Sequence, residues 1–407
     1  MQHDPVQRAL GRDIRCVHGH ALQSPEPVVC VELTTPPRFA TMEREWRDLT
    51  GRALTDNAFL EPLLIVAAGA AGPATIHVLL AWSTPVPGVE SRLVGLWALA
   101  DRPAAPTALR VLEAPVHDHA FLGTPVLDRD AAEAALSGML AAIACEPSMP
   151  HLIRIGSLDA TGPVATIFAD LLDRWRLPFT HIETRLRPAL LKTQPGAGAS
   201  MVSASRAKAL RKRRRHLGLL GDVDVTRHDS AGDIEQAVEE FLALEGSGWK
   251  ARRSSHGQAI LRFPEVARFF RTAVTALAAD DRARITALRL DGRAIAMQLT
   301  LHSGKTAFTW KTAFDESLRA CAPGLLLHQE ITAALMADAE VDVADSCCHD
   351  ASSYMAEFWQ GRRAVSDLLI DVGPGPAWRF ALIAGLEAGR LRLRRTARRV
   401  RAMLAGG

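Results

Sequence analysis

Residues 284–315, RITALRLDGRAIAMQLTLHSGKTAFTWKTAFD, contain three runs in which apolar and β-branched residues predominate. Asp-Gly at 291–292 separates the first two runs, and Ser-Gly at 303–304 separates the second from the third. Both dipeptides are typical of tight hairpin turns. The stretch therefore predicts an antiparallel meander of three strands, and the rest of the chain can be placed around it.

Helical and extended patterns alternate on both sides of this meander. Upstream lie two helical patterns, and downstream come a helix opened by Pro-Gly, a short strand, a helix and a final strand. The part before residue 192 shows a similar order of elements, without a visible repeat of residues. We expect an α/β fold, in fuller terms an α+β fold with a mixed sheet, built twice.

The length of 407 residues also favours two or three domains. Residues 192–205 are rich in Gly, Ala and Ser, the composition of a linker. We expect an N-terminal α/β domain over 28–191, the linker over 192–205, a second α/β domain over 206–372 and a basic helical tail over 373–407.

Basic residues are concentrated in two segments, although the net charge is only +3. Residues 184–221 contain ten Lys/Arg and no acid, and residues 388–407 contain seven Arg and no acid. Any contact with a polyanion is therefore expected to be local. The basic C-terminal segment would allow peripheral contact with the inner face of a membrane, or would be a solvated helix packed on its own protein.

Several other classes of site lack support in the sequence. The six cysteines are scattered, and Cys347 and Cys348 are adjacent with no second metal-binding pair, so we expect no metal. The chain has no P-loop, Rossmann or nucleophile-elbow motif. It also has no signal-peptide pattern at its start and no long apolar run. We expect a cytoplasmic protein.

The second half of the chain resembles a GNAT acyltransferase domain in its order of elements. The doubled order resembles the FemAB-like tandem arrangement, and the details resemble the CelD-like branch found with bacterial polysaccharide systems. Similar proteins commonly carry Lys after the tyrosine, where this chain has Met355. The resemblance is carried by LRKRRRHLGLLGDVDV (210–225), FLALEGSGWKARRSSHGQAI (241–260), GRAIAMQLTLHSGKTAFTWKTAFDE (292–316), APGLLLHQ (322–329) and YMAEFWQG (354–361).

The resemblance implies an N-acyltransferase that moves an acyl group from acyl-CoA, first of all acetyl-CoA, to an amine. The acceptor would be a small molecule or a glycan precursor in bacterial polysaccharide or cell-envelope biosynthesis. Two alternatives remain open: a FemAB-like transferase that uses aminoacyl-tRNA, and a non-catalytic scaffold with this fold. Outside the first alternative we expect no nucleic-acid partner.

In GNAT proteins the donor's pyrophosphate binds where the fourth strand turns into a helix, because a helix N-terminus offers unpaired N–H groups. That turn corresponds here to LRACAPGLLLHQ. The resemblance thus assigns cofactor binding to Arg319, Pro323, Gly324 and Leu325. The alternative is that Pro-Gly simply starts a helix.

Three residues are candidates for proton transfer. Glu245, at the end of a helix, is the candidate base, or else a solvated helix-terminal acid. Tyr354, the one tyrosine of the sequence, is the candidate acid, since a tyrosine on the corresponding helix lies near the thioester sulfur in many GNAT enzymes. Asp345 closes a strand and is a catalytic candidate or a helix N-cap.

Four residues are candidates for acceptor binding. Trp249 and Lys250 match a Trp-Lys pair of similar proteins, and Trp249 is either a pocket wall or a packing anchor. Lys311 and Asp315 would flank the same cleft, or would form an ordinary ion pair at a strand edge.

The run RAKALRKRRRHLG at 206–218 is expected to form the first helix of the second domain. Helical spacing lets Leu210 and Leu217 be buried while most of the guanidinium groups stay in water. Its charge would then be available to an anion such as a CoA phosphate, an acidic sugar precursor or tRNA.

Overall fold

The structure, a computed structural model, describes residues 14–15, 29–71, 74–83, 91–192, 203–248, 259–348 and 354–405. The chain folds as two compact units. Unit 1 comprises Met1–Arg185 and Ala364–Gly407, and unit 2 comprises Leu186–Arg363. The expected domains follow the chain without a break, whereas unit 1 takes up the strand and helix after residue 363. Residues 193–202 of the expected linker lie outside the described residues, and its last two residues belong instead to helix α7 Ala204–Gly218.

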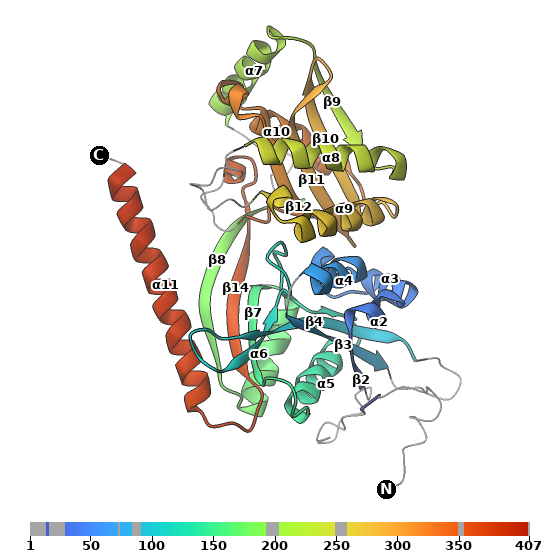
Figure 1. The fold of residues 1–407 in the computed structure, drawn as a ribbon, viewed down its shortest axis with the longest axis vertical. Coiled ribbons are helices and arrows are strands. Elements are labelled where there is room, and N and C mark those ends of the chain that lie inside the picture. The colour runs from blue at the N-terminus through green and yellow to red at the C-terminus, as the bar shows by residue number, and fades with distance from the viewer. Residues whose placement is uncertain are drawn as a thin grey trace. The chain divides into compact units, whose positions relative to one another are not determined.

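Unit 1 is a mixed sheet covered on both faces (Figure 1). Along β3, Val78 and Leu80 pack into one apolar cluster with α2 to α4, while Leu79 and Ala81 pack into another with α5 and α6. This alternation follows from the two-residue period of a strand. The strands of unit 1 are β1 Ile14–Arg15, β2 Val29–Thr34, β3 Thr75–Ser83, β4 Leu93–Pro103, β5 Arg110–Ala114, β6 Val126–Leu127, β7 Leu152–Asp159, and parts of β8 Phe179–Leu191 and β14 Gly361–Asp371.

The helices of unit 1 lie before β3 and after β6 in the chain. They are α2 Pro36–Ala40, α3 Glu43–Gly51, η1 Ala58–Leu60, α4 Pro62–Ala71, α5 Ala132–Cys145, α6 Pro163–Trp175 and α11 Trp378–Ala405. Helix α11 forms the expected basic tail, and Ile383 on it packs against Leu369 of β14. Among the described residues, no helix combines the length and apolar character needed to cross a bilayer.

The sheet of unit 1 is completed by the last strand of the chain. The strand order is β1-β2-β3-β4-β5-β7-β14-β8, so β14 lies between β7 and β8. Strand β14 pairs antiparallel with β7, with Ile370 opposite Ile153. The chain therefore leaves unit 1 within β8 and returns to it within β14.

Unit 2 contains the predicted meander. The expected three strands are β10 Ala283–Leu290, β11 Arg293–Ser303 and β12 Thr306–Phe314, paired antiparallel in chain order. Asp291 and Gly292, at φ 50° and 77°, form the first turn, as the Asp-Gly signal predicts. Strand β9 Val223–His228 pairs with β10 at one edge. On the other side, β13 Val343–Asp345 pairs parallel with β12, and the end of β8 pairs with β13.

Helices cover both faces of this second sheet (Figure 1). On one face, Phe270 of α9 stacks on Trp310 of β12, with ring centroids 5.4 Å apart. On the other, Leu326 and Ile331 of α10 join the cluster that also buries Leu210. The helices of unit 2 are α7 Ala204–Gly218, α8 Ala231–Ser247, η4 Ile260–Arg262, α9 Pro264–Ala278, η5 Glu316–Cys321, α10 Pro323–Ala337 and η6 Tyr354–Glu357. The expected mixed α/β architecture is confirmed.

The arginine-rich segment forms a helix of unit 2, α7. Ser203 caps it, because its hydroxyl accepts a hydrogen bond from the N–H of Arg206 at 3.3 Å. Leu210 and Leu217 are buried, at 1% and 0% exposure, while Arg211, Arg214 and Arg215 are exposed. The structure thus has the amphipathic division that the helical spacing predicts.

Candidate functional site

The second half of strand β12 has an edge along which no strand pairs in the described part of the chain, and we call it the open edge. Strand β13 pairs with β12 only from Thr306 to Phe308, although β12 continues to Phe314. A strand edge without a neighbouring strand offers N–H and C=O groups to an extended ligand that contains amides. This open edge lies wholly within unit 2, and the candidate residues are described relative to it.

Strand β12 also carries a bulge at this edge. Leu299 of β11 faces Lys311 and Thr300 faces Thr309, so Trp310 is an extra residue between two consecutive register pairs. A bulge interrupts the ladder and re-aims the local backbone groups. Lys311 is half-buried beside it.

Tyr354 lies near the open edge. Its side chain is hydrogen-bonded to that of Thr312 in β12. Although the residue as a whole is 38% exposed, desolvation of the phenol raises the pKa of Tyr354 to about 12, and the Thr312 bond offsets only part of this rise. The hydroxyl is therefore protonated at neutral pH and can donate a hydrogen bond.

The helix expected around Tyr354 is in fact a short 3₁₀ turn, η6. Met355, which replaces the Lys of similar proteins, is 3% exposed and packs in the apolar cluster of α10. Phe358 and Trp359 are buried in the same cluster, so three apolar side chains hold this segment in addition to the backbone bonds from Phe358 and Trp359 to the carbonyl of Met355. The helical spacing of its apolar residues misled the sequence-based interpretation.

Asp345 is a fully buried carboxylate at the end of β13. Arg187 and Arg363 lie 2.6 and 2.9 Å from its Oδ2, and the N–H of Cys347 donates to Oδ1 at 2.9 Å. Burial alone would raise the pKa of Asp345, but the two arginines and the Cys347 N–H hold it below its usual value. The alternative of a helix N-cap is not supported, because Asp345 caps a turn that no helix follows directly.

Asp345 and Tyr354 both contact strand β12. The hydroxyl of Thr309 donates to the backbone O of Asp345 at 3.1 Å, and Thr312 bonds Tyr354. The two threonines lie on either side of the bulge. Two of the catalytic candidates predicted from the sequence, Asp345 and Tyr354, therefore contact the same segment of β12.

Glu245 is buried, at 4% exposure, near the end of α8. Its Oε2 accepts a hydrogen bond from the N–H of Ile260 at 2.9 Å and thereby ties η4 to α8. The alternative interpretation of a solvated helix-terminal acid is therefore wrong. A role as general base stays a prediction. Trp249 and Lys250 lie outside the described residues.

The N-terminus of α10 follows β12 through η5. Its N-cap, Ala322, has φ 50° and provides no side-chain cap. Pro323 is buried at the first helical position, Gly324 and Leu325 are half-buried, and Arg319 is exposed on η5. A Cβ on Gly324 would meet Phe314 at an ordinary 3.6 Å, so protein packing does not require glycine there.

Asp315 has structural partners of its own. It caps η5 by accepting from the N–H of Ser317 at 2.9 Å, and it pairs with Arg293 at 2.8 Å. Burial would raise its pKa, but Ser317 and Arg293 lower it. The ion pair at this strand edge is thus formed with Arg293.

Two buried polar residues beside the edge escaped the sequence-based interpretation. Gln298 of β11 faces Thr312 in register and is fully buried, and neither atom of its amide has a hydrogen-bond partner in the described part of the chain. The same holds for both ring nitrogens of His328 in α10, whose ring contacts that of Tyr354 edge to face at 5.8 Å. A polar residue inside an apolar run was the available signal for each.

Arg187 was also missed. It sits in RLRPALL, where the apolar neighbours predict burial but do not reveal the distant carboxylate that accompanies it. Among the residues that the structure describes, no group of three or more His, Cys, Asp or Glu is placed to hold a metal ion.

Comparisons with known proteins agree with this topology. Residues 204–355 match the family model described as an acetyltransferase (GNAT) domain. No curated protein matches the chain. The structure of FemX superposes with a TM-score of 0.52 at 10% identity, over 83% of this chain and 96% of FemX.

Two further solved structures give lower scores. The C-terminal domain (DUF2156) of a putative lysylphosphatidylglycerol synthetase from Agrobacterium fabrum has a TM-score of 0.48 at 11% identity, covering 86% of this chain and 96% of that domain. A tandem GNAT protein from the clavulanic acid biosynthesis pathway has a TM-score of 0.41 at 14% identity, covering 85% of this chain and all of that one.

The family match spans the open edge of β12, the α10 N-terminus and Tyr354. The likeness to FemX extends over both units and concerns the fold alone. The resemblance seen in the sequence is confirmed at these two levels: residues 204–355 match the acetyltransferase (GNAT) domain model, and the fold of the chain is similar to that of FemX.

Proposed function

We propose that the protein is an N-acyltransferase that transfers an acyl group from acyl-CoA to an amine. The observation that carries this proposal is the open, bulged edge of β12 inside the part of the chain that matches the GNAT family model. Acetyl-CoA is the first donor to test. The acceptor is a small-molecule or glycan-precursor amine of bacterial polysaccharide or cell-envelope biosynthesis, as the CelD-like resemblance suggests.

The donor binds along β12. The pantetheine arm is extended and contains two amides, so it can lie as an added strand along the open edge beyond Phe308, where no described strand pairs with β12. Its pyrophosphate then meets the uncapped N-terminus of α10, where the N–H groups and the helix dipole favour negative charge. Arg319 on η5 adds a positive charge beside this terminus.

The bulge serves the reacting carbonyl. The bulge at Trp310 re-aims the local backbone, which suits N–H groups of this segment to approach the thioester oxygen as negative charge develops on it. The amine nitrogen attacks the carbonyl carbon, the C–S bond breaks, and the acyl group becomes an amide. One proton leaves the amine and one is taken up by the thiolate, so the step is balanced.

Two of the three sequence-predicted residues are assigned to proton transfer and the third to positioning. Tyr354, protonated at neutral pH, donates to the leaving sulfur. Glu245 accepts the amine proton, directly or through a water. Asp345, ionised between two arginines, acts as a positioning residue that fixes the end of β13 against Thr309. Trp249, Lys250, Lys311 and Asp315 are assigned to the acceptor.

A second candidate is transfer from aminoacyl-tRNA. The seven Lys/Arg of α7 favour it, because phosphates bind such a surface without reading the base sequence. The proposed location is the cytoplasm, with peripheral membrane contact through the basic part of α11. Oligomerisation is not part of the proposal.

The test is thermal unfolding of the full chain with acetyl-CoA, a longer acyl-CoA or tRNA. A ligand bound only by the native state raises the melting temperature, because at a hundredfold excess over Kd it adds about 2.7 kcal/mol to the free energy of unfolding. We expect both thioesters to raise it, and CoA-thiol release with an amine to follow. If no thioester shifts the melting temperature while tRNA does, the second candidate replaces the first. If none does, the scaffold alternative stands.

A further inference from the structure

Helix α7 carries more positive charge than unit 2 neutralises. It has seven Lys/Arg and no acidic residue. Arg206 pairs with Glu357 at 2.5 Å and Arg214 with Glu330 at 2.6 Å. The other five, Lys208, Arg211, Lys212, Arg213 and Arg215, have no acidic partner within the described ranges of the chain.

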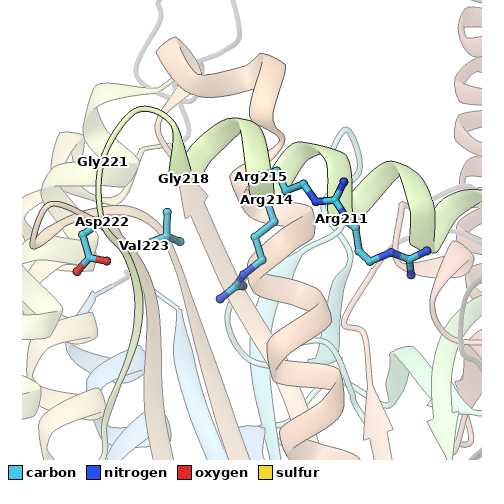
Figure 2. A pocket seen from close by; sticks show the side chains of 7 residues that line it. All are labelled: Arg211, Arg214, Arg215, Gly218, Gly221, Asp222 and Val223. Atoms are coloured by element: carbon cyan, nitrogen blue, oxygen red, sulfur yellow. The ribbon is translucent and has the colours of Figure 1, made fainter.

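Three arginines of α7, namely the paired Arg214 together with Arg211 and Arg215, line a pocket of about 460 Å³ at the C-terminal half of the helix. Figure 2 shows Arg211, Arg214 and Arg215 extending from the helix, with Gly218, Gly221, Asp222 and Val223 completing the lining. Asp222 is the single acid among these seven residues. Planar guanidinium groups in such a concave site suit the oxygens of a phosphate.

The turn beside the pocket exposes two leucines. Leu219 is 85% exposed and Leu220 is 50% exposed, and they stand between Gly218 and Gly221, which both line the pocket. No other large apolar side chain in the described ranges is as exposed as Leu219. Helix α7 is held to its unit by Leu210 and Leu217, so packing of α7 does not use the exposed pair.

We infer that α7 and the turn Gly218–Gly221, together called the α7 tip, bind the surface of an anionic phospholipid bilayer. Leu219 and Leu220 enter the region below the headgroups, and the pocket takes one headgroup phosphate. The exposed unpaired cations, Lys208, Arg211, Lys212 and Arg215, face the lipid phosphates. A basic cluster beside exposed apolar side chains fits a membrane interface better than RNA. RNA would use the charge alone, and residues 203–223 hold no Phe, Tyr or Trp for base stacking.

The inference goes beyond the proposed acyl transfer, and each can fail without the other. The test is co-sedimentation of the full chain with phosphatidylcholine vesicles and with vesicles that also contain about one third phosphatidylglycerol. Binding is expected only to the anionic vesicles, and it should weaken at high salt. Melting temperature and circular dichroism verify that each variant below is folded.

Charge and apolar contact are removed separately. Arg211→Gln with Arg215→Gln should lower the partition coefficient about 25-fold, since each cation near the surface contributes about fivefold. Leu219→Ser with Leu220→Ser should lower it about tenfold or more. Arg262→Gln with Arg268→Gln removes the same charge from exposed positions on η4 and α9 and should change it less than about twofold.

Other results would overturn the inference. Vesicle binding that persists in the leucine variant at wild-type strength contradicts a bilayer-inserting tip. Binding that is abolished by Arg392→Gln with Arg394→Gln on α11, yet unaffected by changes in the α7 tip, places the contact on α11 instead. Absence of vesicle binding also overturns the inference. In that case, tRNA binding that requires Arg211 and Arg215 identifies the α7 tip as an RNA surface. A rise of the melting temperature with inorganic phosphate alone identifies it as a site for free phosphate.

Discussion

The side chain of Tyr354 has two neighbours of different kinds. The side chain of Thr312 is hydrogen-bonded to that of Tyr354. The neutral ring of His328 packs edge to face with the phenol ring, with ring centroids 5.8 Å apart. Neither neighbour carries a charge that would ionise the phenol. The residue is therefore suited to donate a proton or a hydrogen bond and unsuited to act as a base.

Tyr354→Phe keeps the ring and removes the donor. If the proposed acid role holds, kcat for CoA-thiol release should fall about a hundredfold or more, while KM for acyl-CoA stays nearly constant. Steady-state kinetics measure both. Thr312→Val, which removes only the partner of the hydroxyl, is the control and should have a much smaller effect. Full activity in Tyr354→Phe removes the assignment.

His328 should make stability depend on pH. Burial lowers its pKa from 6.5 to about 3, so between these pH values the unfolded chain binds a proton that the folded chain does not. The contribution of His328 to the free energy of unfolding therefore falls by about 1.4 kcal/mol per pH unit as the pH drops below about 6.

Urea unfolding of His328→Leu at pH 5 and at pH 7 tests this. The variant should lose less stability than the wild type between the two values, because Leu has a similar volume and no proton to bind. His216→Leu, at an exposed position of α7, should behave like the wild type. Equal slopes for His328→Leu and the wild type would contradict the argument.

At the scale of the element, local signals decided what could be predicted. The three strands from 283 to 314 and their first turn follow from period-two patterns and Asp-Gly, both properties of neighbouring residues. The α10 N-terminus follows from Pro-Gly. The bulge at Trp310 has no sequence signal, because it depends on the register with β11. The 3₁₀ turn at Tyr354 was likewise decided by the burial of Met355 and Trp359 in a distant cluster.

The α10 N-terminus offers a substitution that separates folding from ligand binding. Gly324→Ala places a methyl group in ordinary contact with Phe314 and should stabilise the helix by about 0.5–1 kcal/mol. The same methyl group would keep the donor phosphate from the backbone, so Kd for acyl-CoA should rise about tenfold. Calorimetric titration and urea unfolding measure the two effects.

Gly232→Ala is the matched control, since Gly232 is also the second residue of a helix and a Cβ there meets nothing within 4 Å. It should stabilise α8 without changing Kd. If Gly324→Ala binds acyl-CoA as tightly as the wild type, the α10 N-terminus is not the phosphate site.

At the scale of the whole molecule, long-range pairing escapes the sequence. Patterns located the strand after residue 361 but could not tell which unit it would enter, because either sheet could accept it. The buried triad of Arg187, Asp345 and Arg363 is equally non-local: its members come from β8, β13 and β14, and no spacing links them. The missing information was the order of strands in space. This order determines both the unit that β14 enters and the grouping of Arg187, Asp345 and Arg363.

The position of β14 predicts an unusual effect of a substitution. Ile370 is fully buried and faces Ile153 of β7, so Ile370→Ala should destabilise unit 1 by about 2–5 kcal/mol. Native-state hydrogen exchange should show faster exchange of the β7 amides and little change in β11. Ile295→Ala, also fully buried, should give the reverse pattern. Loss of protection in β11 alone on changing Ile370 would contradict the assignment of β14.

The same strand order has a consequence during synthesis on the ribosome. Strands β7 and β8 of unit 1 emerge well before the strand that belongs between them, which ends at Asp371. At about 5–20 residues per second, the nascent chain holds this gap for roughly ten to forty seconds. Until then β7 keeps an open, apolar edge that can pair with another chain. Newly made protein is therefore most prone to aggregate after its N-terminal half is complete and before its last strand is released.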